Sequence, residues 1–124
     1  MAHNNHKKIE RALRWAQWRR EREDIAGALP VIEAFNARLE AGREPFFAPT
    51  IRAALITKHH WMIVVCRSCG LVLDLDLRVK RRPPEATILM ALADVKCPRC
   101  NGHGRPEVVR LAKWASVAST RTWR

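Results

Sequence analysis

The fold is decided by residues 61–77, WMIVVCRSCGLVLDLDL. The stretch opens with an apolar run, mostly β-branched or aromatic, and closes with leucines that alternate with valine and aspartates. Both halves are typical of β-strands, and the tight turn between them predicts an antiparallel hairpin. The alternation places Asp74 and Asp76 on the face opposite the leucines, where we expect a solvated strand face and no catalytic pair.

A second cysteine pair follows the hairpin, and both pairs have the spacing C-x-x-C. This spacing lets one tight turn present two thiolates to one ion while backbone amides point at the sulfurs. In a reducing compartment, paired cysteines of this kind favour a metal over disulfides. The sequence therefore predicts one four-thiolate zinc site, with iron as the main rival metal. Its ligands are Cys66, Cys69, Cys97 and Cys100.

Four thiolates close the coordination shell of zinc, whereas a catalytic zinc keeps one position open. We therefore expect a structural ion in a protein that is not an enzyme. A divergent metal-dependent nuclease is the lesser alternative, because no histidine lies between the two pairs to bind a catalytic metal. Three histidines lie near the cysteine pairs in the sequence, and their plainest interpretation is polar surface residues, against a proton donor, a substitute ligand or a phosphate contact. These are His59, His60 and His103.

The order strand, C-x-x-C-G, strand, insertion, C-P-x-C-x-G, strand is similar to the zinc ribbon group, and the resemblance covers about residues 60–112. Cys69-Gly70-Leu71-Val72 resembles the knuckle of transcription-factor ribbons. The resemblance implies a small β-ribbon around a buried structural zinc ion. It implies no substrate, because zinc ribbons serve in transcription, ribosomal and RNA-processing proteins and also as protein-docking modules.

Residues 9–23 have the period of a helix with two competing stripes. One stripe is apolar, and the other carries Trp15 and Trp18 between arginines. We expect one stripe to pack on the rest of the protein and the other to make a second contact or to stay partly exposed. The alternative is that the two tryptophans meet RNA bases or a partner protein.

A second helix is expected over residues 30–41, because Gly27 weakens the first helix and Pro30 suits a first helical position. Phe46 and Phe47 lie in a proline-containing connector and are expected to plug a core. The inward positions of the second helix follow helical spacing and are Ile32, Phe35 and Leu39.

Two further short helices and a strand are expected around the cysteine pairs. A helix capped by Thr50 fits residues 50–57, and an amphipathic helix fits residues 85–93. The apolar side of the second one is Ile88, Leu89 and Leu92. Residues 107–111 favour a strand.

The predicted fold class is α+β, with a helical N-terminal half followed by a small antiparallel zinc-ribbon sheet that contains an inserted short helix. The expected organisation is a helical region over 1–49, a ribbon domain over 50–114 and a flexible basic tail over 115–124.

The chain is strongly basic, with 23 Lys and Arg against 12 Asp and Glu and a formal net charge of +11. It stays basic when four thiolates surround Zn²⁺. This balance favours a polyanionic partner, DNA or RNA ahead of a membrane, with a protein partner as the second possibility. The candidate phosphate contacts are Arg67, Arg78, Lys80, Arg81, Arg82, Arg99 and Arg105.

No apolar run is long enough to cross a bilayer, and the first residues are polar and charged, unlike the apolar core of a signal peptide. We therefore expect a cytoplasmic protein.

Overall fold

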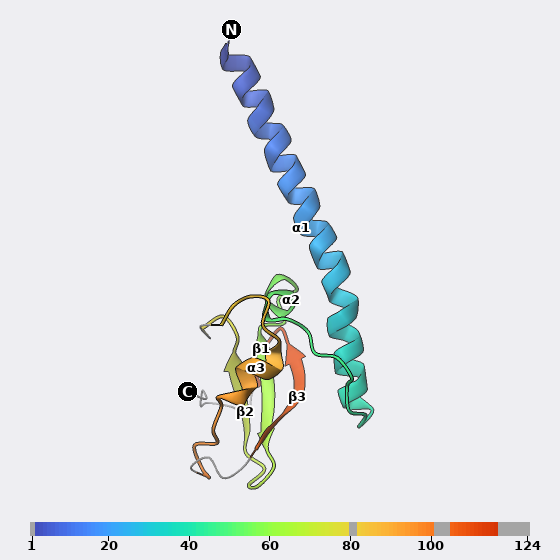
Figure 1. Ribbon diagram of the computed structural model, residues 1–124, viewed down its shortest axis with the longest axis vertical. Helices are drawn as coiled ribbons and strands as arrows, with labels where there is room; N and C mark the ends of the chain where they lie inside the picture. Colours follow the sequence, from blue (N-terminus) through green and yellow to red (C-terminus); the bar gives the residue numbers. More distant parts are fainter. Residues whose placement is uncertain (1, 80–81, 101–104, 117–124) are drawn as a thin grey trace.

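The computed structural model describes residues 2–79, 82–100 and 105–116. It has one long helix, a three-stranded antiparallel sheet and two short helices, which confirms the predicted α+β class (Figure 1). The elements in chain order are α1 (Ala2–Glu40), α2 (Ile51–Ile56), β1 (Trp61–Cys66), β2 (Val72–Asp76), α3 (Ile88–Ala93) and β3 (Pro106–Ala112).

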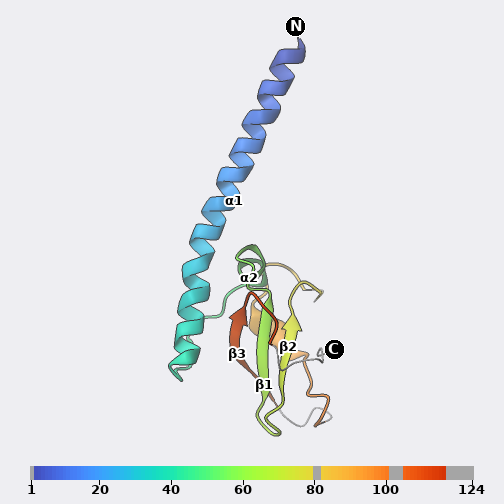
Figure 2. The same cartoon turned by 180° about the vertical axis from the view of Figure 1, so that it is seen from behind.

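The helix α1 corrects the expectation of two helices, because it runs unbroken through Gly27 and Pro30. A proline inside a helix lacks an amide hydrogen and crowds the preceding turn, which weakens the helix here without ending it. Ile32 and Phe35 are buried in the core and Leu39 packs against it, so the expected inward positions are confirmed. The part of α1 that precedes them projects beyond the sheet, as the two opposite views show (Figures 1 and 2).

The sheet has the strand order β2-β1-β3, and both pairings are antiparallel. Met62 and Val64 of the central strand are fully buried and lie opposite Leu75 and Leu73 of β2. The same face continues onto β3 through Val108 and Leu111 and is covered by helices. The helical side chains in this core are Ile32, Phe35, Ile51, Ala54, Ile88 and Ala91.

The opposite face of the sheet is also covered at its centre. Ile63 and its cross-strand partner Asp74 are only 3% and 2% exposed. The backbone N–H of Ser116 donates to Asp74 Oδ2 at 2.6 Å, so the segment after β3 reaches this face. The expectation of a solvated face is therefore wrong for Asp74, because residue alternation identifies a face but not the chain that covers it. Asp76 is half-buried and accepts hydrogen bonds from Arg78.

A side-chain amide of α1 satisfies the outer edge of β3. Asn36 Nδ2 donates to the carbonyl of Leu111, and Asn36 Oδ1 accepts from the N–H of Leu111, both at 2.9 Å. An edge strand otherwise presents such groups unpaired. Asn36 thus takes the place of a neighbouring strand and fixes the position of α1 along the sheet.

The short helix α2 has the expected cap, since Thr50 Oγ1 accepts from the N–H of Ala53 at 3.1 Å. The inserted helix α3 begins at Ile88, later than expected, and it buries Ile88 while Leu89 is 48% exposed. An isolated antiparallel bridge between Thr50 and Thr87 joins the starts of the two helices. The two helices therefore enter the core side by side from paired backbone.

Only one of the two phenylalanines in the connector plugs the core. Phe47 packs edge-on against Phe35 with ring centroids 6.2 Å apart. Phe46 is 80% exposed, with the Arg38 guanidinium 4.6 Å from its ring centroid. The expectation is therefore confirmed for Phe47 and wrong for Phe46.

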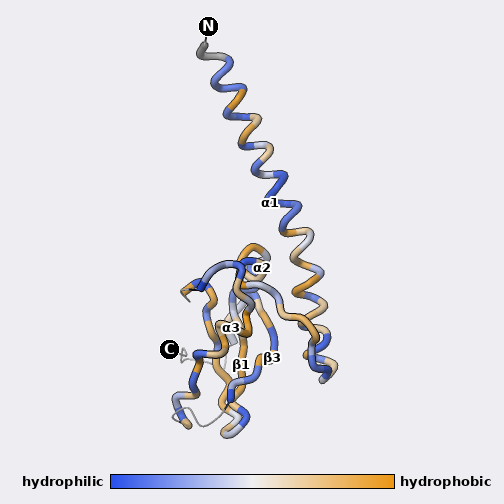
Figure 3. Tube along the Cα trace, in the orientation of Figure 1, coloured by the Kyte–Doolittle hydropathy of each residue, from blue (hydrophilic) through white to orange (hydrophobic). Residues whose placement is uncertain are grey.

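Hydrophilic and hydrophobic residues alternate along the projecting part of α1 (Figure 3). None of the helices in the described part of the chain combines the length and the apolar character needed to span a bilayer.

Candidate metal centre

Two turns bring the four cysteines together at the end of the sheet that is remote from the N-terminus of α1 (Figure 1). All four Sγ atoms lie within 4.8 Å of one another. The Sγ atoms of Cys66 and Cys100 are 3.8 Å apart, and those of Cys69 and Cys97 are 3.6 Å apart. A tetrahedral ion with metal–sulfur bonds of about 2.3 Å spaces its ligands roughly 3.8 Å apart. The donor set and its spacing therefore fit a tetrahedral metal ion.

The first turn holds its shape through the backbone of Gly70. The N–H of Gly70 donates to the carbonyl of Cys66 at 2.8 Å, and the N–H of Cys66 donates to the carbonyl of Leu71 at 2.9 Å. Gly70 has a φ of +73°, in the left-handed region that glycine adopts without steric cost. Glycine at this position thus allows the turn to close with both sulfurs on one side.

Backbone amides in this turn favour a thiolate at Cys66. The N–H of Cys69 lowers the pKa of the Cys66 thiol to about 7, and the N–H of Ser68 adds to this effect against the opposing effect of burial. The hydrogen bond with the Cys69 thiol, together with burial, raises the pKa of the Cys100 thiol to about 12. Hydrogen bonds from neighbouring thiols thus favour a thiolate at Cys66 and oppose one at Cys100. A divalent cation would remove the opposition at Cys100.

Burial makes the cluster part of the core. Cys66 and Cys97 are 0% and 1% exposed and belong to the core, while Cys69 and Cys100 pack against it half-buried. Among the described residues the cluster consists of cysteines alone. Four protein ligands leave no position for a substrate, so the arrangement suits a metal ion held for structure.

The predicted phosphate contacts nearest the cluster are Arg67, Arg99 and Arg105, and all three are exposed. The N–H of Arg67 donates to the carbonyl of Arg105 at 3.3 Å, which places these two side by side. Arg67 is engaged, since its Nε and Nη2 donate to the two carboxylate oxygens of Glu107 at 2.9 Å each. Hydrogen bonds with Arg67 hold the pKa of Glu107 below its usual range. Much of the Arg67 charge is therefore neutralised within the fold.

The other predicted contacts that the structure describes are Arg78, towards the opposite end of the sheet, and Arg82, in the chain that follows it. Arg78 forms a two-pronged pair with Asp76, with Nη2 to Oδ2 at 2.8 Å, and its guanidinium lies 5.6 Å from the ring centroid of Trp61. Arg82 pairs with Asp94. Since β1 spans roughly 17 Å at 3.3 Å per residue, Arg67 and Arg78 belong to separate surfaces.

Several sequence predictions fall on residues outside the described ranges. These are the predicted phosphate contacts Lys80 and Arg81, His103 and residues 117–124 of the expected tail.

The described histidines next to β1 have polar and aromatic neighbours. His59 Nδ1 lies 2.9 Å from the carbonyl oxygen of Thr57, and burial lowers the pKa of this imidazole. The ring centroids of His60 and Trp61 are 5.7 Å apart. Neither histidine belongs to the cysteine cluster.

The tryptophans of α1 are not packed on the domain. Trp15 and Trp18 are 58% and 46% exposed, and they stack on each other with ring centroids 5.0 Å apart and planes at 27°. Ile9 and Leu13, on the apolar stripe, are exposed as well. The expectation that one stripe packs on the rest of the protein is therefore wrong, because only the later part of α1, from Ile32 onward, lies against the core.

The surroundings of the two tryptophans include the arginines expected on their stripe and one more, Arg14, which the helical pattern did not single out. Arg11 and Arg14 line a shallow depression together with Trp15 and Trp18. The guanidinium of Arg22 lies 4.9 Å from the ring centroid of Trp18. The spacing i, i+4, i+7 and i+11 from Arg11 places the tryptophans and Arg22 on one stripe, and Arg14, at i+3, lies at the edge of the same stripe.

No family model matches this chain, and neither a curated protein nor a solved structure shows significant similarity to it. The likeness to zinc ribbons therefore rests on the four clustered cysteines and the small antiparallel sheet that carries them, both of which fit a zinc-ribbon-like site.

Proposed function

We propose that the protein binds one structural zinc ion and binds nucleic acid through a basic surface, without being an enzyme. The observation that carries the metal part is the closed cluster of four Sγ atoms within 4.8 Å of one another. Zinc suits a tetrahedral all-thiolate set and has no redox chemistry of its own. Bound at this place, the ion offsets part of the negative charge of the thiolates and ties the turn after β1 to the turn after α3.

Metal analysis of the purified protein tests this part. We expect one zinc ion per chain and, after exchange with Co²⁺, the absorption bands of a tetrahedral thiolate site. The variant Cys97→Ser should retain less than one ion per chain, whereas Ser68→Ala, in the first turn but not a ligand, should retain it fully. Iron as the native metal, or cleavage of nucleic acid that requires Mg²⁺, would contradict the proposal.

The net charge of +11 supports the nucleic-acid part, because a chain this basic attracts polyanions. We expect the zinc-loaded protein to bind single-stranded and duplex oligonucleotides, with the logarithm of the binding constant falling linearly as the logarithm of the salt concentration rises. Absence of binding at low salt, or an affinity that ignores salt, would refute it. Because Arg67, Arg78 and Arg82 are already paired with carboxylates, charge reversal at these positions tests whether they take part at all.

The stacked and exposed tryptophans of α1 favour a second candidate, a module that docks on a partner protein. Exposed aromatic residues are frequent energetic centres of protein interfaces. A complex with a purified partner that survives nuclease treatment and is lost in Trp15→Ala/Trp18→Ala would support this function instead.

A further inference from the structure

The projecting part of α1 carries a stripe of cations around its two tryptophans. At about 100° per residue, the stripe occupies roughly 100° of the helix circumference and contains no acidic residue. Glu10 and Glu21 lie along one margin. We name it the tryptophan stripe, and its members are Lys7, Arg11, Arg14, Trp15, Trp18 and Arg22.

Side chains within the stripe form a short stack along the helix. Trp15 lies against Trp18 at a centroid distance of 5.0 Å, and the guanidinium of Arg22 lies 4.9 Å from the centroid of Trp18. Trp18 therefore has two neighbours within the stack, whereas Trp15 stands at its N-terminal end and is the more exposed of the two. The stack presents an aromatic ring at its end that can take a further flat group.

Cations flank that open end. Arg11 and Arg14 line the shallow depression beside the two tryptophans, and both are exposed. Within the described residues, neither arginine forms an ion pair, unlike Arg67 or Arg78 of the sheet. The stripe thus combines uncompensated positive charge with an available aromatic face.

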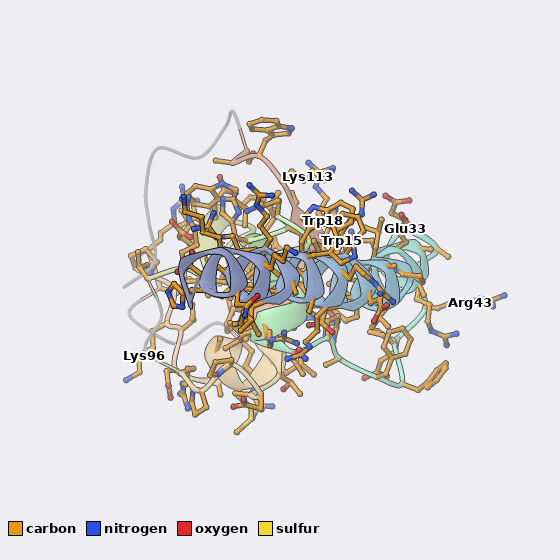
Figure 4. All side chains as sticks on the ribbon, turned by 90° about the horizontal axis from the view of Figure 1, so that it is seen from above. Trp15, Trp18, Glu33, Arg43, Lys96 and Lys113 are labelled. Carbon is orange, nitrogen blue, oxygen red and sulfur yellow. The ribbon has the colours of Figure 1, made fainter. Side chains whose placement is uncertain are left out.

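The stripe is open to a large ligand. Every residue from 5 to 23 is exposed, and this part of α1 stands clear of the sheet in both views (Figures 1 and 2). Viewed from above, Trp15 and Trp18 lie on the same side of α1 as Lys113, which follows β3 (Figure 4). The stripe therefore faces the side of α1 on which the domain carries this cation.

We propose that the tryptophan stripe binds a single-stranded polynucleotide, with a base stacked on Trp15 and the adjoining phosphates paired with Arg11 and Arg14. This proposal rests on the proposed nucleic-acid function. It places the main binding site on α1 and not at the arginines of the sheet. Aromatic platforms beside cations bind unpaired strands, because every base offers a face for stacking and every linkage a charge. A duplex offers the charges but keeps its bases stacked inside.

Two other occupants fit the stripe less well. A second copy of the same stripe would bring cations against cations, because no acidic residue lies within it. A membrane-bound helix keeps its apolar residues on one face and its cations on the other. Here the tryptophans share a stripe with the arginines, while Ile9 and Leu13 lie on nearly the opposite side.

The test uses the full-length, zinc-loaded protein and labelled probes of one length. The probes are an unpaired thymidine strand, an unpaired uridine strand, a duplex, and an abasic strand that keeps all its phosphates. Fluorescence anisotropy over a salt series gives affinity and slope. We expect the unpaired strands to bind more tightly than the duplex or the abasic strand, and the thymidine and uridine arms separate DNA from RNA.

Matched variants on the same helix locate the site. Trp15→Ala should weaken binding of the unpaired strands on the order of tenfold. It should leave binding of the abasic strand unchanged. Leu13→Ala, exposed on the other stripe, is the control. Arg14→Gln should lower the salt slope by roughly 0.7, the value for one phosphate contact of a single strand. The control Arg20→Gln removes the same charge outside the stripe and should leave the slope unchanged. Circular dichroism confirms that each variant keeps its helix.

The outcomes separate this inference from the function on which it rests. If the protein binds no probe, the proposed nucleic-acid function fails. If it binds but Trp15→Ala and Arg14→Gln behave like their controls, the function stands and the stripe is not its site. Equal affinity for the duplex, or displacement of the strand by anionic phosphatidylserine vesicles but not by neutral ones, also overturns the inference. So does a nuclease-resistant complex with a purified protein that depends on Trp15.

Discussion

At the scale of single residues, two aspartates on one strand have opposite environments. Burial raises the pKa of Asp74 above its ordinary value, against hydrogen bonding from Ser116 and the charge of Arg110. Hydrogen bonds from Arg78 lower the pKa of Asp76. The two carboxylates therefore couple folding to pH with opposite signs.

The pair gives a prediction for stability as a function of pH. Because the pKa of Asp74 is raised in the folded state, its protonated form favours folding. This contribution to the free energy of unfolding is fully present below the unfolded pKa, about 3.9, and is lost as pH rises through the folded pKa. The free energy of unfolding of the native protein minus that of Asp74→Asn should therefore fall as pH rises from about 4. Urea unfolding at a series of pH values measures this difference.

Asp76→Asn is the matched control with the reverse sign. The lowered pKa of Asp76 contributes stability above the unfolded pKa, and this is lost as pH falls through the folded pKa. The same difference for Asp76 should therefore rise with pH. Parallel curves for the two variants would contradict the environments described for these carboxylates.

The sequence predicted the role of a residue correctly where neighbouring residues determine that role, and failed where a distant segment does. The metal ligands follow from spacing alone, because two C-x-x-C turns have one common use and the chain only has to bring them together. The burial of Asp74 could not be predicted locally, because the segment that reaches it, at Ser116, lies far along the sequence. The projecting tryptophans were visible in the sequence, but their exposure was not, since it depends on where α1 leaves the sheet.

At the scale of elements, the continuity of α1 is the clearest departure from expectation. Gly27 and Pro30 are each unfavourable inside a helix, and local rules end the helix there. The structure keeps one helix because Ile32, Phe35 and Asn36 anchor the following turns on the core and on β3. Tertiary contacts thus outweigh the local preference for ending the helix, and the local sequence does not show these contacts.

Pro30 gives a prediction for the middle of α1. Pro30→Ala restores an amide hydrogen and removes the clash with the preceding turn, which is worth up to about 3 kcal/mol in a helix interior. Hydrogen exchange of the amides around this position should slow. Val31→Ala, exposed one residue further along the same helix, should leave it nearly unchanged. Faster exchange in Pro30→Ala would show that the helix is not continuous there.

Asn36 gives a prediction for the contact between α1 and β3. Asn36→Leu keeps a similar size but leaves the N–H and carbonyl of Leu111 without their partners, at a cost of about 1–3 kcal/mol. Chemical denaturation measures the loss. Glu33→Gln, exposed on the same helix, is the control and should stay near the native value. An unchanged stability in Asn36→Leu would mean that water replaces the amide without penalty.

At the scale of the whole molecule, stability should reside in the sheet and its metal end rather than in the projecting helix. Removal of residues 1–22 discards only exposed side chains among those described and should leave the denaturation midpoint nearly unchanged. Removal of the metal by a chelator should lower the midpoint strongly, because both turns and the buried Cys66 and Cys97 depend on it. Thermal unfolding of the two preparations makes the comparison. Equal sensitivity to both treatments would contradict this division.

The long helix also sets a length. Between Trp15 and Asn36, at 1.5 Å per residue, α1 covers roughly 30 Å as one continuous helix. Asn36 attaches one end of that span to the edge strand. The turns that carry the four cysteines lie at the end of the sheet remote from the N-terminus of α1 (Figure 1). For the binding proposed above, α1 would act as a spacer, because a strand bound at Trp15 would lie at this separation from anything bound to the sheet.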